Sequence, residues 1–189
     1  FLNGRIWQGP RKSTCVPGLN CYSCPGALGA CPLGALQSSL SGVLLRFPFY
    51  VLGLMLLFGL LFGRTVCGWL CPFGFIQELL YKIPSPNFTK NKATRTLTKL
   101  KYIIGLLFVI ILPVIFFYVV GVGAPAFCKY ICPAGTLEAA LPLLSTNPFL
   151  KQNLGMLFNW KLFLLLVTVI ASIVIYRPFC RFICPLGAF

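Results

Sequence analysis

The sequence predicts an all-α membrane protein with three, or at most four, transmembrane helices and short helices that follow Cys-Pro-x-Gly motifs. Of the 189 residues, 58% are hydrophobic and only 10% are charged, whereas soluble domains carry about 25% charged residues. A surface that faces lipid explains the missing charge. Three long apolar runs in one short chain are typical of membrane crossings rather than of buried helices in a soluble core.

The three apolar runs cover residues 47–63, 102–123 and 154–176. A crossing needs about 20 apolar residues, with a range of about 17–25, so the first run is at the short limit. In the second run, Pro113 predicts a kink. In the third run, we expect the ammonium group of Lys161 to extend toward a membrane interface.

The whole chain, residues 1–189, is expected to be one membrane-embedded domain, with a Cys-rich segment over residues 1–42 and a helical core over residues 43–189. It is also expected to continue beyond both ends, because it starts with Phe and stops soon after a Cys-Pro pair.

The basic residues predict the orientation of the chain. The net charge is +14, and the basic residues lie mainly in short segments between apolar runs, as the positive-inside bias and contact with anionic lipid require. Nucleic acid is therefore not an expected partner. Three crossings place residues 64–101 and 177–189 on one side, which has the larger number of basic residues. We expect the loop from Lys82 to Lys101 to face the cytoplasm, in a multi-pass protein of the bacterial inner membrane.

A repeated motif, Cys-Pro-x-Gly, organises the cysteines. It occurs four times, beginning at Cys31, Cys71, Cys132 and Cys184. Three copies are preceded by another cysteine four positions earlier, namely Cys67, Cys128 and Cys180. Since proline is favoured at the first helical position, each Cys-Pro cysteine is expected to be the N-cap of a short helix. There the helix dipole and the free N–H groups stabilise the thiolate that a metal requires.

The residue types exclude most other chemistry. The chain has no histidine and only two carboxylates, Glu78 and Glu138. A haem held by histidine, a histidine-containing zinc site and paired-carboxylate catalysis are therefore not expected. Ten cysteines remain, and four thiolates are what a [4Fe–4S] cluster requires.

We expect two [4Fe–4S] clusters. Crossing parity brings one set of four thiols to the same membrane face: Cys67, Cys71, Cys180 and Cys184. The opposite face holds six cysteines, of which the repeat favours Cys24, Cys31, Cys128 and Cys132 as ligands. There, Cys15 and Cys21 are alternative ligands or a disulfide pair, and Cys15, Cys21 and Cys24 can exchange roles. Cys15, Cys21, Cys24 and Cys31 could also form a local site of their own.

Three polar residues recur at the sixth position after a Cys-Pro cysteine: Gln37, Gln77 and Glu138. We expect them to support the cluster loops by hydrogen bonding. Two other uses of the thiols remain open. Structural zinc on four cysteines usually has closely spaced ligand pairs in small soluble modules. A transmembrane thiol–disulfide relay typically needs one reactive pair rather than two sets of four.

The segments at residues 67–77 (CGWLCPFGFIQ), 128–138 and 180–187 resemble the membrane-bound 4Fe-4S proteins with C-x3-C-P motifs, a group that includes the NapH-type and NosR-type proteins. Residues 15–37 resemble the N-terminal segment of a bacterial subgroup of 4Fe-4S membrane proteins. The resemblance implies electron transfer across or along the membrane. Because the chain has no histidine, only two separate carboxylates and cysteines that fall into sets, we expect a non-catalytic electron-transfer subunit of an oxidoreductase complex. Its expected partners are the bilayer and redox subunits of the flavin, haem or ferredoxin type. An anchor whose clusters only stabilise the fold remains an alternative.

Overall fold

The computed structural model describes residues 9, 14–21, 24, 29–40, 48–83, 96–121, 125–146 and 155–188. Over these ranges the regular structure is helical, and an isolated parallel bridge joins Cys15 to Ala30, so the predicted all-α class is confirmed for the described residues. The helices, in chain order, are α1 (Pro32–Leu40), α2 (Phe49–Leu61), η2 (Gly63–Thr65), α3 (Val66–Trp69), α4 (Pro72–Tyr81), α6 (Leu100–Ile104), η3 (Gly105–Ile111), α7 (Leu112–Val120), α8 (Ala126–Tyr130), η4 (Thr136–Ala140), α9 (Leu141–Thr146), α11 (Met156–Val174), α12 (Pro178–Phe182) and η5 (Pro185–Ala188).

Two helices among the described residues are long and apolar enough to cross a membrane. Helices α6, η3 and α7 join into Leu100–Val120, which has 21 residues and a mean hydropathy of 3.1, and α11 has 19 residues and a mean hydropathy of 2.1. Helix α2 has 13 residues, which at 1.5 Å per residue span only about 20 Å of a hydrocarbon core that is about 30 Å thick. The second and third apolar runs therefore form helices of crossing length, whereas the first forms a shorter apolar helix.

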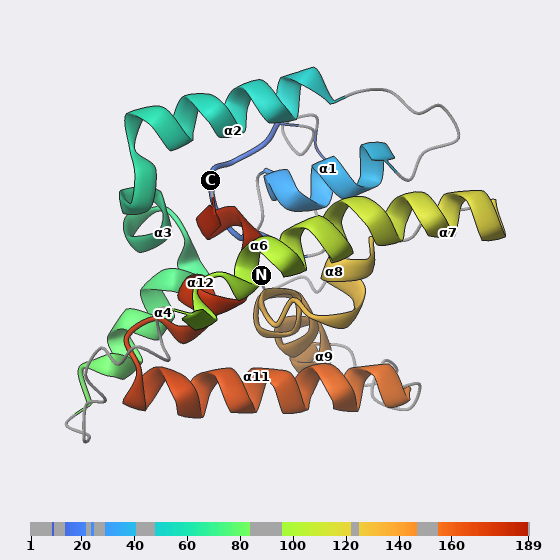
Figure 1. Ribbon diagram of the computed structural model, residues 1–189. Coiled ribbons are helices and arrows are strands. Elements are labelled where there is room, and N and C mark those ends of the chain that lie inside the picture. The colour runs from blue at the N-terminus through green and yellow to red at the C-terminus, as the bar shows by residue number, and fades with distance from the viewer. Residues whose placement is uncertain are drawn as a thin grey trace.

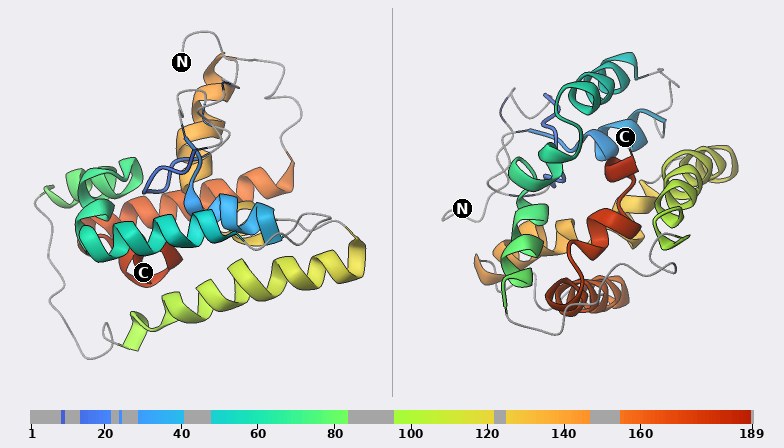
Figure 2. Two further views of the ribbon diagram at one scale, coloured as in Figure 1. Left: turned by 90° about the horizontal axis from the view of Figure 1, so that it is seen from above. Right: turned by 60° about the vertical axis from the view of Figure 1, so that its left-hand side comes forward.

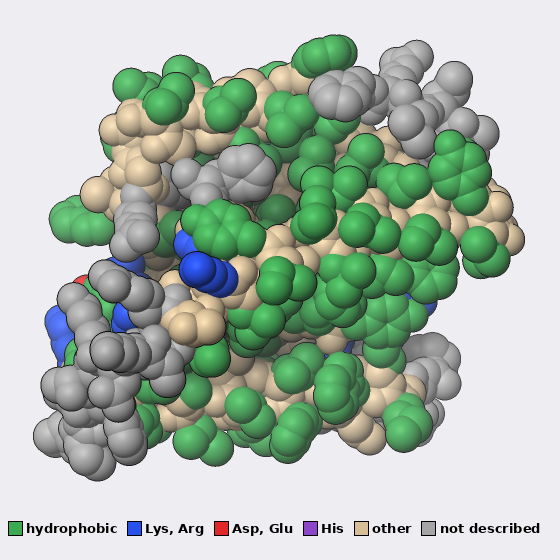
Figure 3. All heavy atoms as spheres, in the orientation of Figure 1, with side chains coloured by type: hydrophobic (Ala, Val, Ile, Leu, Met, Phe, Trp, Pro, Cys, Tyr) green, Lys and Arg blue, Asp and Glu red, His purple; other side chains and the backbone are tan. Residues whose placement is uncertain are grey.

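The long helices enclose the cysteine motifs. Helix α2, the α6–α7 helix and α11 run in roughly the same direction across the molecule, and α1, α8, α12 and η5 lie among them (Figure 1, Figure 2). Helix α4 contacts α11, α8 contacts η3, and η5 contacts α6. Large apolar side chains cover the outer surface (Figure 3). Half of the cysteines are in the buried core instead: Cys15, Cys31, Cys71, Cys132 and Cys184.

Pro113 changes the hydrogen bonding of its helix. Directly before it the chain forms the π-helix η3, in which the Leu112 N–H donates to the Leu107 carbonyl. In that register the donor to the Phe108 carbonyl would be residue 113, but proline has no N–H. The buried Gln37 side chain of α1 takes this place, because its Nε2 donates to the Phe108 carbonyl at 3.1 Å. This bond joins the Cys31 motif to a membrane helix.

Candidate metal centres

Three of the four Cys-Pro cysteines lie directly before a short helix, whereas the next helix after Cys132, η4, begins at Thr136. Cys71 is the N-cap of α4, with extended backbone and Pro72 in the first turn, as the sequence predicts. Helix α1 begins directly after Cys31, and η5 directly after Cys184. Burial raises the pKa of the Cys31 thiol to about 11, and the backbone N–H groups of Gly34 and Leu33 oppose this by lowering it. The motif thus directs helix N–H groups at a buried sulfur.

Two motif glycines allow a close approach of the backbone within their own motif. A Cβ atom on Gly74 would lie 2.0 Å from the carbonyl oxygen of Cys67, and one on Gly187 would lie 2.7 Å from that of Cys180. Real Cβ atoms do not come so near backbone atoms. The glycine at the end of Cys-Pro-x-Gly therefore lets the chain fold back onto the earlier cysteine of the same motif.

We call the four thiols of Cys67, Cys71, Cys180 and Cys184 site one. Burial is the main cause that raises the pKa of Cys180 to about 12, and the negative charges of Cys71 and Cys67 contribute to the rise. Burial also raises the pKa of Cys184, which has Cys180, Cys71 and Cys67 as electrostatic neighbours. The structure therefore brings together two motifs that are more than one hundred residues apart in the sequence.

We call the four thiols of Cys21, Cys31, Cys128 and Cys132 site two. Burial raises the pKa of Cys132 to about 12, with a further contribution from Cys31 and a smaller one from Cys21. Burial is also the main cause that raises the pKa of Cys128, whose electrostatic neighbours include Cys132, Cys31 and Cys21. A Cβ atom on Gly135 would lie 3.4 Å from the Cys21 sulfur.

Among the N-terminal cysteines, Cys21 and Cys24 are both candidates for the fourth position at site two. The sequence favours Cys24 beside Cys31, Cys128 and Cys132, whereas the described electrostatic neighbours of Cys128 and Cys132 include Cys21. Cys15 and Cys24 are free, buried thiols. The N–H of Cys24 donates to the carbonyl of Cys21 at 2.9 Å, so the two cysteines are the ends of one turn.

Sites one and two are neighbours. Cys71 of site one raises the pKa of Cys31 of site two, as the smallest of several causes. The Leu19 N–H, from the Cys-rich segment, donates to the Cys71 sulfur at 3.4 Å. Crossing parity predicts sites at opposite membrane faces. The structure differs because the motif helices fold back among the long helices: α8 contacts η3 in the middle of its helix.

The three recurring polar residues have three different partners. Gln77 Nε2 lies 3.6 Å from the Cys180 sulfur, and Glu138 Oε2 accepts a hydrogen bond from the Cys21 N–H at 2.9 Å. Burial raises the pKa of Glu138 to about 7, and that N–H opposes the shift. Gln37 instead supports the π-helix described above.

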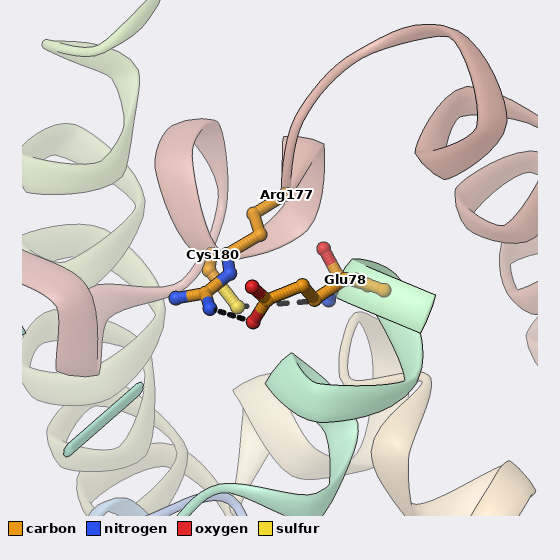
Figure 4. A network of polar contacts seen from close by, with 4 residues as sticks. Glu78, Arg177 and Cys180 are labelled. Atoms are coloured by element: carbon orange, nitrogen blue, oxygen red, sulfur yellow. Dashed lines mark hydrogen bonds and ion pairs between the residues drawn. The ribbon is translucent and has the colours of Figure 1, made fainter. Parts of the chain in front are cut away.

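Two basic residues at the sites are not identified by motif spacing. Lys161, which the sequence predicts at an interface, donates to the Cys128 carbonyl at 2.9 Å. Arg177, directly after the third apolar run, lies beside Cys180 and pairs with Glu78 (Figure 4). The only sequence signal is a basic residue within an apolar run, for Lys161, or directly after one, for Arg177.

The donor set suits an iron–sulfur cluster. Each site offers four soft sulfur donors, with backbone N–H groups aimed at several of them, and such groups stabilise cluster thiolates. Among the described residues, no three side chains of His, Cys, Asp or Glu lie close enough together to hold a single metal ion. The thiolates at each site repel one another, and the positive charge of bound iron would relieve this repulsion.

The chain is similar to one protein family and to several known proteins. Residues 43–91, 103–145 and 159–189 match the family described as the 4Fe-4S binding domain. The chain is 33% identical over 137 residues to an uncharacterized protein of Methanocaldococcus jannaschii, which covers 69% of this chain and 48% of that protein. It is 35% identical over 136 residues to the protein NirI of Paracoccus denitrificans, with 69% of this chain and 17% of NirI covered. For the regulatory protein NosR of Pseudomonas aeruginosa, the identity is 32% over 138 residues, with 68% of this chain and 16% of NosR covered.

The chain spans less than half the length of each of these relatives, and no solved structure matches it. The matched family segments contain six of the site cysteines: Cys67, Cys71, Cys128, Cys132, Cys180 and Cys184. Cys21 and Cys31 lie before the first matched segment. Because the match covers more than half of the chain and includes all three C-x3-C-P motifs, the chain belongs to the 4Fe-4S binding domain family.

Proposed function

We propose that this chain is a multi-pass membrane subunit that holds two [4Fe–4S] clusters and passes electrons between them. One cluster is held by site one and the other by site two, with Cys21 in the place that the repeat favours for Cys24. The packing of the motifs against one another supports the proposal: Gln77 Nε2 lies 3.6 Å from the Cys180 sulfur, and a Cβ atom on Gly34 would lie 4.0 Å from the Cys128 sulfur. When bound, the clusters supply one-electron redox chemistry.

The placement of the sites supports direct transfer between them. The Leu19 N–H, two residues before Cys21 of site two, donates to the Cys71 sulfur of site one at 3.4 Å, and this contact supports a short path between the two ligand sets. Two ligands of each site are buried, namely Cys71 and Cys184 at site one and Cys31 and Cys132 at site two. The electron donor and acceptor are then partner proteins of the flavin, haem or ferredoxin type, which dock near the ends of the helices.

The thiol–disulfide relay is less well supported. A relay needs a thiolate that attacks a disulfide, and burial raises the pKa of Cys31 to about 11 and that of Cys132 to about 12. Both thiols are neutral near pH 7, so they are poor nucleophiles. Binding of iron displaces these protons, because a thiolate is the form that binds the metal. Burial of the sulfurs is therefore compatible with a cluster.

Anaerobic purification tests the proposal. We expect about eight iron and eight sulfide atoms per chain, with broad visible absorption that dithionite bleaches. The variants Cys71→Ser and Cys132→Ser should each contain about half of the iron of the wild-type protein. A colourless, iron-free protein with titratable thiols would refute the proposal.

Two further variants identify the fourth ligand of site two. Cys21→Ser should lose the site-two cluster, whereas Cys24→Ser, a matched change three residues away, should retain both clusters. Loss of the site-two cluster in Cys24→Ser but not in Cys21→Ser would identify Cys24 as the fourth ligand.

A further inference from the structure

Arg177 has an unusual backbone conformation beside site one. It follows the C-terminal end of α11 and directly precedes Pro178, and its φ angle is +47°. A residue with a side chain rarely adopts this left-handed conformation. Among the described residues, it is the only one other than glycine with a positive φ. Such a conformation persists where the surrounding contacts hold it.

Those contacts come from three directions. The guanidinium Nη2 pairs with Glu78 Oε2 of α4. The guanidinium carbon lies 5.0 Å from the centre of the Tyr176 ring. On the third side is Gly68 of α3, where a Cβ atom would lie 2.8 Å from Nη2 and 2.9 Å from Nη1. The guanidinium group therefore fits against the backbone next to Cys67.

The missing side chain at position 68 is informative when the three C-x3-C-P motifs are compared. The residue after the first cysteine is Gly68 in one motif but the basic Lys129 and Arg181 in the other two. At position 68 the chain has no charge of its own, and the space that a side chain would fill is next to the guanidinium group of Arg177. The positive charge next to the backbone of Gly68 therefore comes from Arg177, which lies more than one hundred positions later in the sequence.

The charge lies close to the sulfurs and is shielded from solvent. In Figure 4 the guanidinium group of Arg177 and the sulfur of Cys180 lie next to each other, and both face Glu78. The side chain of Arg177 is 17% exposed, whereas that of Glu78 is 40% exposed. Because screening weakens a charge more at the surface than in the interior, the positive charge acts on the sulfurs more strongly than the carboxylate does.

We propose that Arg177 is a positioning residue that raises the reduction potential of the site-one cluster, with Glu78 holding its guanidinium group in place and partly opposing its charge. This inference rests on the proposed function, because it needs a cluster at site one. A reduced cluster carries one more negative charge than an oxidised one. A fixed, partly buried cation therefore stabilises the reduced form.

Redox titrations followed by electron paramagnetic resonance test this proposal on the purified chain. Arg177→Gln should lower the equilibrium constant for reduction of the site-one cluster roughly tenfold or more. For a one-electron couple, this is a fall of about 59 mV in the reduction potential. Glu78→Gln should raise the potential, and the double variant should lie between the single ones. Lys161→Gln, which removes the cation at the Cys128 carbonyl, is the matched control and should leave the site-one potential unchanged. The signal that survives in Cys132→Ser identifies site one.

The outcomes separate the two proposals. Wild-type protein without iron and sulfide refutes the proposed function. Arg177→Gln with full iron content and an unchanged site-one potential overturns only the inference about Arg177. If Arg177→Gln loses its cluster, Arg177→Met, which keeps the aliphatic part of the side chain, is measured instead: a lowered site-one potential supports the inference, and an unchanged or raised one overturns it.

Discussion

The bond between Gln37 and the Phe108 carbonyl gives a quantitative test of how the Cys31 motif is attached to the membrane helix. Gln37 is 0% exposed, and its Nε2 donates to that carbonyl at 3.1 Å. Gln37→Leu keeps a side chain of similar size but removes the donor. A buried carbonyl that loses a hydrogen bond costs about 1–3 kcal/mol, so the free energy of unfolding should fall by that amount.

The neighbouring proline provides the second half of the test. In the π-helical register, the Phe108 carbonyl lacks a backbone donor because residue 113 is proline. Pro113→Ala restores an N–H at that position, and this group can donate to the same carbonyl. In the Pro113→Ala background, Gln37→Leu should therefore cost less, and the two changes should show a coupling energy of about 0.5–3 kcal/mol.

Thermal unfolding in detergent, followed by far-ultraviolet circular dichroism, measures all four proteins of this cycle. Ser38→Ala, at the neighbouring exposed position of α1, is the control and should change the unfolding midpoint little. An equal loss of stability from Gln37→Leu in both backgrounds would refute the reasoning, because the carbonyl would then not be the group that Gln37 satisfies.

Three further predictions concern the sites. Gly74→Ala should displace the Cys67 carbonyl, since the new Cβ atom would lie 2.0 Å from it, and should lower the iron content by about half; Gly53→Ala, with nothing within 4 Å, should retain all of it. Gln77→Leu removes the amide at 3.6 Å from the Cys180 sulfur and should lower the site-one potential in a redox titration, because hydrogen bonds to sulfur raise it; a rise would contradict this role. Removal of iron with a chelator should lower the thermal midpoint, because bound metal contributes to folding stability; an unchanged midpoint would count against structural coupling.

Hydrophobicity predicted the two longer membrane helices but not the length of α2. The apolar run extends over residues 47–63, yet α2 ends at Leu61, and Gly63 has a φ of +49°. A glycine in the left-handed region ends a helix and redirects the chain. A count of apolar residues does not detect such an end, because glycine was counted within the run.

Motif spacing predicted the thiols that the structure groups from the C-x3-C-P motifs, because a four-residue step places both sulfurs on one side of a helical turn. It could not choose between Cys21 and Cys24. That choice depends on the turn in which the Cys24 N–H donates to the Cys21 carbonyl and on the packing of Gly135 against the Cys21 sulfur. The place of Arg177 likewise depends on the close packing of α3, α4 and α12, which a charge count does not contain.

The four Cys-Pro-x-Gly copies fall into two kinds that match the two sites. Gly74 and Gly187, from the motifs of site one, lie against carbonyl oxygens of their own motifs. At site two the motif glycines face sulfur atoms of a different segment: a Cβ atom on Gly34 would lie 4.0 Å from the Cys128 sulfur, and Gly135 lies against Cys21.

The ligand sets follow the same division. Site one joins two complete C-x3-C-P motifs, whereas site two joins one such motif to the Cys-rich segment. At site one the glycine shapes the backbone of the ligand loop itself. At site two a Cβ atom on either glycine would be in ordinary van der Waals contact with the sulfur of the other segment. The same short motif therefore folds back tightly on itself at site one, where only glycine fits, and packs against a separate segment at site two.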